Sequence, residues 1–281
     1  MPGTPFNDEK LTEVQKAAIF AKYGMDQPIH VQFFTYLKNM LTGDFGLSYS
    51  ISKNMQVSTL MGPKIPISFG IGIAAVILGT IIGIALGIVA ALKKNTGWDT
   101  AATVFAVIGV SIPSFVVGLL LLLLFGVEIP VFPIIFDTSN IVLSSVLPVI
   151  ALSLSVIANV ARFTRSEMIG VLGSDYILLA EAKGLDYGTI IKRHALRNSL
   201  IPVVTILGPI LVNLLTGSMV LEKIFGIPGL GRLLVDAINA NDYNIIMGVS
   251  FLYSLLYVVM MLIVDISYGI IDPRIRLGKE E

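Results

Sequence analysis

Cysteine is absent from this 281-residue sequence, and charged residues make up only 14% of it. The first absence excludes disulfides, thiolate nucleophiles and cysteine-ligated metals. The low charged fraction is unlike that of soluble domains, in which about 25% of residues are charged. Because 55% of the residues are hydrophobic, we expect an integral membrane protein. Lys plus Arg equal Asp plus Glu at 19 each, so no basic excess indicates nucleic acid as a partner.

The chain also lacks a G-x-x-x-x-G-K-[ST] motif, the loop that cradles nucleotide phosphates in many ATP-driven proteins. Any ATP-driven motion must therefore be delivered by another chain. The two histidines, His30 and His194, lie far apart in the sequence. No acidic or basic residue lies in the middle of an apolar run, which argues against a proton relay through the membrane. We expect no catalytic residue, no metal site and no cofactor.

Five stretches contain no Asp, Glu, Lys or Arg over a length that could cross a membrane. They run from 65 to 92, 100 to 127, 138 to 161, 198 to 221 and 243 to 264. A membrane helix needs about 20 apolar residues, and buried helices of soluble proteins are usually shorter. The sequence therefore predicts an all-α, polytopic membrane protein.

The distribution of Lys and Arg in the loops predicts the orientation. One set of alternate segments contains Lys93, Lys94, Arg162, Arg165, Lys183, Lys192, Arg193, Arg197, Arg274, Arg276 and Lys279. The opposite loops, after the second and fourth spans, contain only Lys223 and Arg232. Since positive loops stay inside, we expect a multi-pass protein of the cell membrane with a cytoplasmic C-terminus. Its parts are an extracytoplasmic region 1–64, a membrane domain 65–271 with a cytoplasmic loop 162–197, and a tail 272–281.

Gly79, Gly83 and Gly87 recur at every fourth residue of the first span, which aligns them on one helix face. Small residues let helix backbones approach closely in lipid. The spacing therefore predicts that this face packs against a neighbouring helix.

Polar residues interrupt the later spans, and the candidates for lining a path are Ser111, Pro113, Ser114, Ser153, Ser155, Asn159, Asn213, Thr216 and Ser218. Hydroxyls and amides at membrane depth face other helices or a water-filled path, because lipid offers them no partner. For any single residue, a hydrogen bond between helices is an equally good interpretation.

The region before the first span predicts two short helices. The first begins near Asn7 and ends at Gly24 to Pro28, and the second has an apolar face from Val31 to Leu41 before Gly43. We interpret the region as a small capping subdomain, with direct substrate contact as the alternative.

The sequence from 175 to 208, DYILLAEAKGLDYGTIIKRHALRNSLIPVVTILG, is charged at first and then runs into the fourth span. Gly173 and Gly184 are natural breaks, and Asp186 can cap a short helix after the second break. Two helices joined at Gly184 would project from the membrane as a knob.

This segment resembles the cytoplasmic EAA loop of ABC-transporter permeases, in the branch that imports dipeptides and oligopeptides. The matches are Tyr176, Ala180, Ala182, Lys183, Gly184, Leu185, His194, Ala195, Leu196, Arg197, Asn198 and Pro202. The resemblance implies that an ATPase subunit receives the loop in a groove, and that the residues that couple to it are Tyr176, Ala180, Ala182, Lys183, Gly184, Leu185, Asp186, His194 and Arg197. The sequence departs from the pattern at Leu178 and Leu179, in place of Glu-Ala, and at Glu181, where the branch usually has Arg.

The loop after the fourth span, EKIFGIPGLGRLLVDAINANDY, resembles the same family. The matching residues are Glu222, Phe225, Pro228, Gly229, Leu230, Gly231, Arg232, Leu233, Leu234, Ala237 and Ile238. The resemblance implies an outer gate or a contact with a substrate-delivery protein for Phe225, Pro228, Gly229, Gly231 and Arg232. A plain turn between helices is the alternative.

The resemblance implies an ABC importer type I permease fold with five spans present. The family's first span precedes a Pro-Gly-x-Pro turn like that at residues 2–5, so we expect this span to be absent here. The implied function is a non-catalytic subunit that forms a path for short peptides by alternating access. The implied partners are a second, homologous permease, two ABC ATPases, an extracytoplasmic binding protein and the lipid bilayer.

Three alternatives stay open. Relatives carry nickel, glutathione or oligosaccharides, and nothing in the sequence separates these cargoes. A stand-alone ion-coupled secondary transporter would need ionisable groups inside the spans, and an intramembrane enzyme would need a catalytic constellation at depth. The spans supply neither.

Overall fold

The computed structural model describes residues 14, 17, 20, 21, 24 and 26–271, without the side chains of 215–217 and 268–271. This part of the chain contains helices and no strand, and its one isolated β-bridge pairs Leu47 with Gln56. Four of the described helices are long and apolar enough to cross a membrane, and a bent helix pair adds a fifth crossing if it counts as one span. The predicted all-α, polytopic fold is confirmed.

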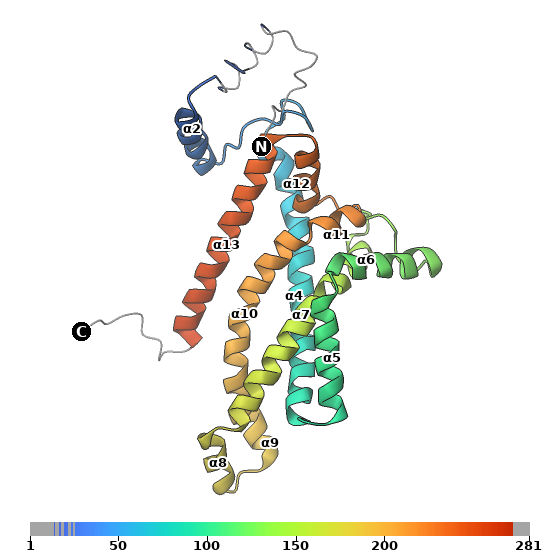
Figure 1. The fold of residues 1–281 in the computed structure, drawn as a ribbon, viewed down its shortest axis with the longest axis vertical. Coiled ribbons are helices and arrows are strands. Elements are labelled where there is room, and N and C mark those ends of the chain that lie inside the picture. The colour runs from blue at the N-terminus through green and yellow to red at the C-terminus, as the bar shows by residue number, and fades with distance from the viewer. Residues whose placement is uncertain (1–13, 15–16, 18–19, 22–23, 25, 272–281) are drawn as a thin grey trace, which may run out of the picture. The chain divides into compact units, whose positions relative to one another are not determined.

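The chain divides into two compact units, residues 1–68 with 228–255 and residues 69–227 with 256–281. The first contains α2 (Ile29–Leu41), α3 (Val57–Met61), the short 3-10 helix η2 (Gly62–Lys64) and α12 (Leu230–Asn239) (Figure 1). The second contains α5 (Gly97–Ser111), α6 (Ser114–Leu122), η3 (Leu123–Glu128), α7 (Ile141–Leu172), α8 (Asp175–Ala182), α9 (Tyr187–Thr189), η4 (Ile190–Ala195), α10 (Leu196–Gly217) and α11 (Met219–Ile224). By residue number, α4 (Ile65–Leu92) and α13 (Tyr243–Ile271) each begin in the first unit and end in the second.

In the second unit α7 is the central helix, and α5, α6 and α10 pack on it. It also lies against α4, as the glycine spacing predicted. A Cβ atom on Gly79 would lie 2.5 Å from Cβ of Val156, and one on Gly83 would lie 2.8 Å from Cβ of Val160. One on Gly87 would lie 2.6 Å from the carbonyl oxygen of Ala161. The three glycines therefore allow a backbone approach that any larger residue prevents.

The second predicted span is two helices bent by 95° at a break between Ser111 and Ser114. Pro113 has no N–H group to continue the helix, and a proline disfavours helical geometry in the residue before it. Ile112 accordingly has φ −88° and ψ 123°. The sequence showed Ser111, Pro113 and Ser114 as an interruption of the run 100–127, but it did not predict this change of direction.

α7 continues to Leu172, so residues 162–172, which the sequence placed in a loop, extend the helix of the third span. Arg165 is part of the packing there. Its Nε and Nη2 donate to the two carboxylate oxygens of Asp99 at 2.5 and 2.8 Å. Asp99 is 5% exposed and also accepts from the backbone N–H of Asn95 at 2.9 Å. This bidentate ion pair fixes the start of α5 to α7.

The fourth predicted span is also interrupted. α10 ends at Gly217 and α11 begins at Met219, with Ser218 between them. Near the middle of α10, Gly208 closely contacts Val264 of α13.

The first unit is held together at the start of α13. Asp242, which is fully buried, accepts hydrogen bonds from Ser48 Oγ at 2.5 Å and from the backbone N–H of Ser50 at 2.9 Å. Asn244 Nδ2 donates to the carbonyl of Leu47 at 2.8 Å. The loop before α3 is thereby fixed to α13.

α2 is the predicted second helix of the N-terminal region, and Gly43, with φ +81°, follows its end. The helix expected to start near Asn7 falls largely outside the described residues.

We expect Gly83→Val to lower the midpoint of thermal unfolding of the detergent-solubilised protein, because the new side chain overlaps Val160 and overpacking costs about 1–3 kcal/mol. Gly70→Val, on the same helix, is the matched control, since a Cβ atom at Gly70 meets nothing within 4 Å. Equal midpoints for the two variants would contradict the close packing of α4 on α7.

Candidate coupling segment and translocation cavity

The break predicted at Gly184 is present. α8 ends at Ala182, and Gly184 has φ +78°, a conformation that L side chains rarely adopt. The backbone N–H of Gly184 donates to the carbonyl of Glu181 at 2.9 Å, and that of Leu185 donates to Ala180 at 3.3 Å. The chain then reverses direction into α9. We call residues 173–189 the elbow.

Asp186 caps the helix that follows, as predicted. Its Oδ2 accepts the backbone N–H of Thr189 at 2.9 Å, and its Oδ1 accepts the Thr189 hydroxyl at 2.7 Å. Both bonds favour the charged carboxylate and hold the pKa of Asp186 below its usual value. The cap sets the direction of the chain from Gly184 into α10.

The two arms of the elbow pack on each other. Ile177 and Ala180 of α8 form a small buried cluster with Ile190 of η4. Asn198 Nδ2 donates to the Tyr176 hydroxyl at 3.1 Å. Ala180, which we predicted to be a coupling residue, is only 6% exposed. It therefore stabilises the elbow through its packing in this buried cluster.

A second buried cluster attaches the elbow to the membrane helices. Ala195 at the end of η4 packs against Met168 of α7 and Ala91 of α4. Ser199 Oγ donates to Sδ of Met168 at 3.5 Å. Ala195 therefore contacts both α4 and α7 where the connection from the elbow ends.

The connection between the two clusters, Ile190–Ala195, is π-helical, which the sequence did not indicate. A π turn contains more residues per turn than an α turn and is frequent at functional sites. His194 lies within it and is half-buried, and Arg197 follows it and is exposed.

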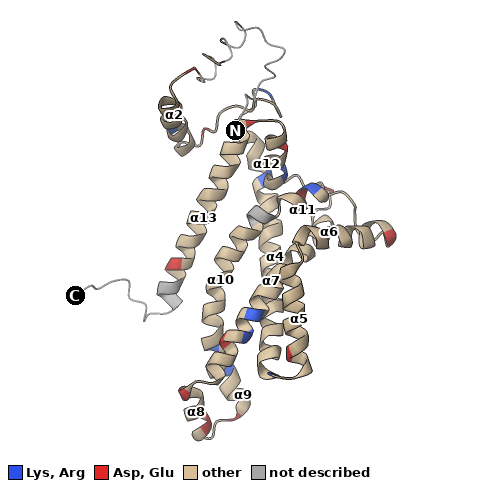
Figure 2. Ribbon diagram, in the orientation of Figure 1, with Lys and Arg blue, Asp and Glu red and all other residues tan. Residues whose placement is uncertain are grey.

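Apolar side chains are exposed on the elbow, over half of their surface for Leu178, Leu179 and Tyr187 and about two-fifths for Tyr176 and Leu185. Sequence reasoning identified Tyr176 and Leu185 but not the other three, because the apolar run 177–180 does not show which residues face outward. Acidic residues lie at both ends of α8, and basic residues lie on the helices next to it (Figure 2). Lys183, Ala182 and Gly184 are exposed as well.

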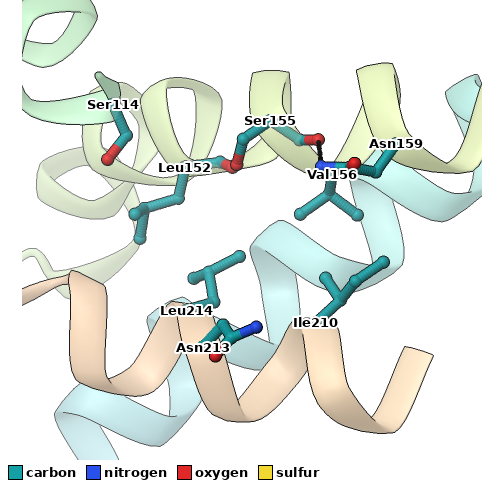
Figure 3. A pocket seen from close by; sticks show the side chains of 8 residues that line it. All are labelled: Ser114, Leu152, Ser155, Val156, Asn159, Ile210, Asn213 and Leu214. Atoms are coloured by element: carbon teal, nitrogen blue, oxygen red, sulfur yellow. Dashed lines mark hydrogen bonds between the residues drawn. The ribbon is translucent and has the colours of Figure 1, made fainter. Parts of the chain in front are cut away.

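A cavity of about 170 Å³ lies between α6, α7 and α10. It is lined by Ser114, Leu152, Ser155, Val156, Asn159, Ile210, Asn213 and Leu214 (Figure 3). Asn159 Nδ2 donates to the carbonyl of Ser155 at 2.8 Å, within α7. The polar groups of the lining are neutral hydroxyls and amides, brought together from three separate spans.

Four of the path candidates therefore lie at one cavity, namely Ser114, Ser155, Asn159 and Asn213. Ser111 and Pro113 do not line it. Ser111 donates its hydroxyl to the carbonyl of Val107 at 2.7 Å, within its own helix. Pro113 bends the chain between α5 and α6. The apolar part of the lining had no sequence signal that distinguished it from lipid-facing residues.

The residues of the Pro-Gly-Leu-Gly loop have mainly packing roles. Phe225 is 2% exposed and packs near Gly118 of α6. Its backbone carbonyl accepts a hydrogen bond from the backbone N–H of Phe136 at 2.8 Å. Pro228 is half-buried, and Gly229 and Gly231 are buried at the start of α12. Arg232 lies 3.6 Å from Asp236 one turn later.

Comparison with known proteins gives a consistent result. A family model described as binding-protein-dependent transport system inner membrane component matches residues 83–277. The dipeptide transport system permease protein DppB of Lactococcus lactis is 45% identical over 99% of this chain and 90% of its own length. The oligopeptide transport system permease protein OppB of Salmonella typhimurium is 43% identical over 98% of this chain and 90% of its own.

Two solved structures share the fold. A chain of the MetNI methionine ABC transporter, in an inward-facing conformation, matches with a TM-score of 0.64 and 15% identity, over 76% of this chain and 96% of its own. A chain of an amino acid ABC transporter matches with a TM-score of 0.56 and 13% identity, over 74% and 92%.

Hydrogen exchange tests the Asp186 cap. We expect the protection factor of the Thr189 amide to be constant above the ordinary carboxyl pKa of about 3.9, and to fall as the pH drops through the lowered pKa of Asp186, where the carboxylate is protonated. In Asp186→Asn the amide oxygen still accepts the bond, so the protection factor becomes independent of pH in this range. Asp175→Asn, which removes a carboxylate without a capping bond, should retain the wild-type profile.

Proposed function

The chain belongs to the family of inner membrane components of binding-protein-dependent transport systems, and we propose that it forms part of the path by which an ATP-driven importer carries short peptides across the membrane. In this proposal the chain itself catalyses no reaction. Its helices change between inward-open and outward-open arrangements when partner ATPases close and reopen.

The elbow carries this proposal. It exposes apolar side chains at a position where the family's coupling loop meets its ATPase, and its packing at Ala195 joins it to α4 and α7. An ATPase that binds Leu178, Leu179 and Tyr187 would move α4 and α7 together. Family membership supports two such ATPases, a homologous second permease and an extracytoplasmic binding protein as partners.

The orientation follows from charge. Of the thirteen Lys and Arg residues that follow the first span, eleven lie on the same side as the elbow, and positive loops face the cytoplasm. We therefore place the elbow and the C-terminus inside, and residues 1–64 with α12 outside.

Peptide cargo is supported by the names of the relatives, which are permeases for dipeptides and oligopeptides. The cavity adds a physical reason. Neutral amides and hydroxyls such as Asn159 and Ser114 can hydrogen-bond the N–H and C=O groups common to all peptides. A lining without charge would not select for a particular side chain.

Gly184 offers a test in proteoliposomes that contain the assembled transporter with its ATPases and binding protein. Nothing lies within 4 Å of a Cβ atom at this position, so only the backbone restricts substitution. We expect Gly184→Val to reduce ATP-dependent uptake of labelled dialanine at least tenfold, because a β-branched residue opposes φ +78°. Gly184→Asn should retain most of the uptake, since Asn tolerates this conformation.

Gly170→Val is the matched control, at an equally open position on α7 that has no positive φ. Co-purification of the ATPases with each variant separates loss of docking from loss of membrane insertion. Uptake by Gly184→Val equal to wild type, or dialanine uptake by this chain without ATPases, would refute the coupling role.

A further inference from the structure

A larger cavity, of about 600 Å³, lies in the first unit. It is formed by α2 with the residues just before it, the loop 44–49 and the start of α13. Its lining consists of Gly24, Gln27, Ile29, Val31, Gln32, Phe33, Thr35, Tyr36, Asn39, Asp44, Gly46, Leu47, Tyr49, Tyr243, Asn244 and Met247. Sites for small ligands have volumes of about 300–1,000 Å³, so this cavity has room for a short peptide.

One wall of the cavity is held in place by close packing and hydrogen bonds. The loop 44–49 approaches α13 so closely at Gly46 that a Cβ atom there would lie 2.8 Å from Nδ2 of Asn244. The same Nδ2 donates to the carbonyl of Leu47 at 2.8 Å. Next to them Ser48 donates to the buried Asp242. The polar groups of this loop are therefore held in place without a ligand.

The lining contains one charged side chain, the carboxylate of Asp44, and no Lys, Arg or His. Oδ1 of Asp44 accepts the backbone N–H of Gly46 at 2.9 Å. No hydrogen bond involves Oδ2 among the described residues, which leaves that oxygen available to a donor from the cavity.

Four aromatic side chains line the same cavity as this carboxylate, those of Phe33, Tyr36, Tyr49 and Tyr243. The hydroxyl oxygen of Tyr36 is buried and has no hydrogen-bond partner in the described part of the chain. Burial, together with Tyr49 and Asp44, raises the pKa of Tyr36, so this phenol stays neutral. A single carboxylate among aromatic faces attracts a cation and repels an anion.

We propose that this cavity binds the protonated amino terminus of a short peptide. Asp44 accepts hydrogen bonds from the ammonium group, and the tyrosines of the lining lie in the same cavity. The assignment rests on the peptide cargo proposed above. Asn39, Gln32 and Asn244 of the lining supply amide groups for the peptide backbone. The cavity would therefore recognise what all unmodified peptides share, a free amino end followed by peptide bonds.

Peptide binding to the assembled transporter in nanodiscs, without its binding protein, tests the proposal. The probes are trialanine and N-acetyl-trialanine, and titration calorimetry gives their affinities. We expect trialanine to bind about tenfold more tightly, because acetylation removes the charge that Asp44 pairs with and a hydrogen bond between charged groups is stronger than one between neutral groups. Asp44→Asn keeps an acceptor for Gly46 and removes the charge, so it should abolish the difference between the probes.

Asp26→Asn is the matched control, because Asp26 is exposed near the cavity but does not line it, and it should leave both affinities unchanged. Equal affinities of the two probes for the wild type, or an unchanged preference in Asp44→Asn, would overturn the assignment. ATP-dependent uptake of trialanine by the complete wild-type transporter is measured in parallel. If uptake occurs while Asp44→Asn retains the preference, only the cavity assignment fails; if wild type neither imports nor binds trialanine, the peptide cargo fails with it.

Discussion

The second unit depends on the close contact between α4 and α7. Three glycines at four-residue intervals bring the backbone of α4 against Val156, Val160 and Ala161. In lipid, helices gain little from burying apolar surface, so such steric fit is the main source of their association. Once α7 is fixed, α5, α6 and α10 pack on its other faces, and the small polar cavity forms among α6, α7 and α10. At the far end of the same two helices, Ala91 and Met168 receive the elbow at Ala195.

The path cavity and the elbow are therefore built on one helix. Asn159 of the cavity and Met168 of the elbow junction lie nine residues apart on α7, a rise of about 13 Å. The Arg165–Asp99 ion pair lies between them and ties α5 to α7. In the function proposed above, this shared helix is the physical route from an ATPase to the cargo path, and it needs no long chain of side-chain contacts.

Much of this could be predicted from the sequence, where a feature depends on a local rule. The glycine spacing, the break at Gly184 and the Asp186 cap follow from backbone geometry and helix periodicity alone. The bend at Pro113 could not be predicted in this way. Proline inside a membrane helix is often accommodated, and the surrounding helices decide whether the chain bends there. Asn159 and Asn213 were recognisable as polar residues at depth, yet Ser111, of the same class, bonds to its own helix. The inward direction of Ala180, on a helix with apolar residues on several sides, depended on packing with Ile190 that no sequence pattern shows.

The π turn at Ile190–Ala195 has a geometric consequence. A π turn holds more residues than an α turn, and one extra residue displaces the helical register by one position. One position corresponds to a rotation of about 100° and a rise of about 1.5 Å. The chain that enters α10 from the elbow therefore faces a direction about 100° away from the one that an uninterrupted α-helix would give it.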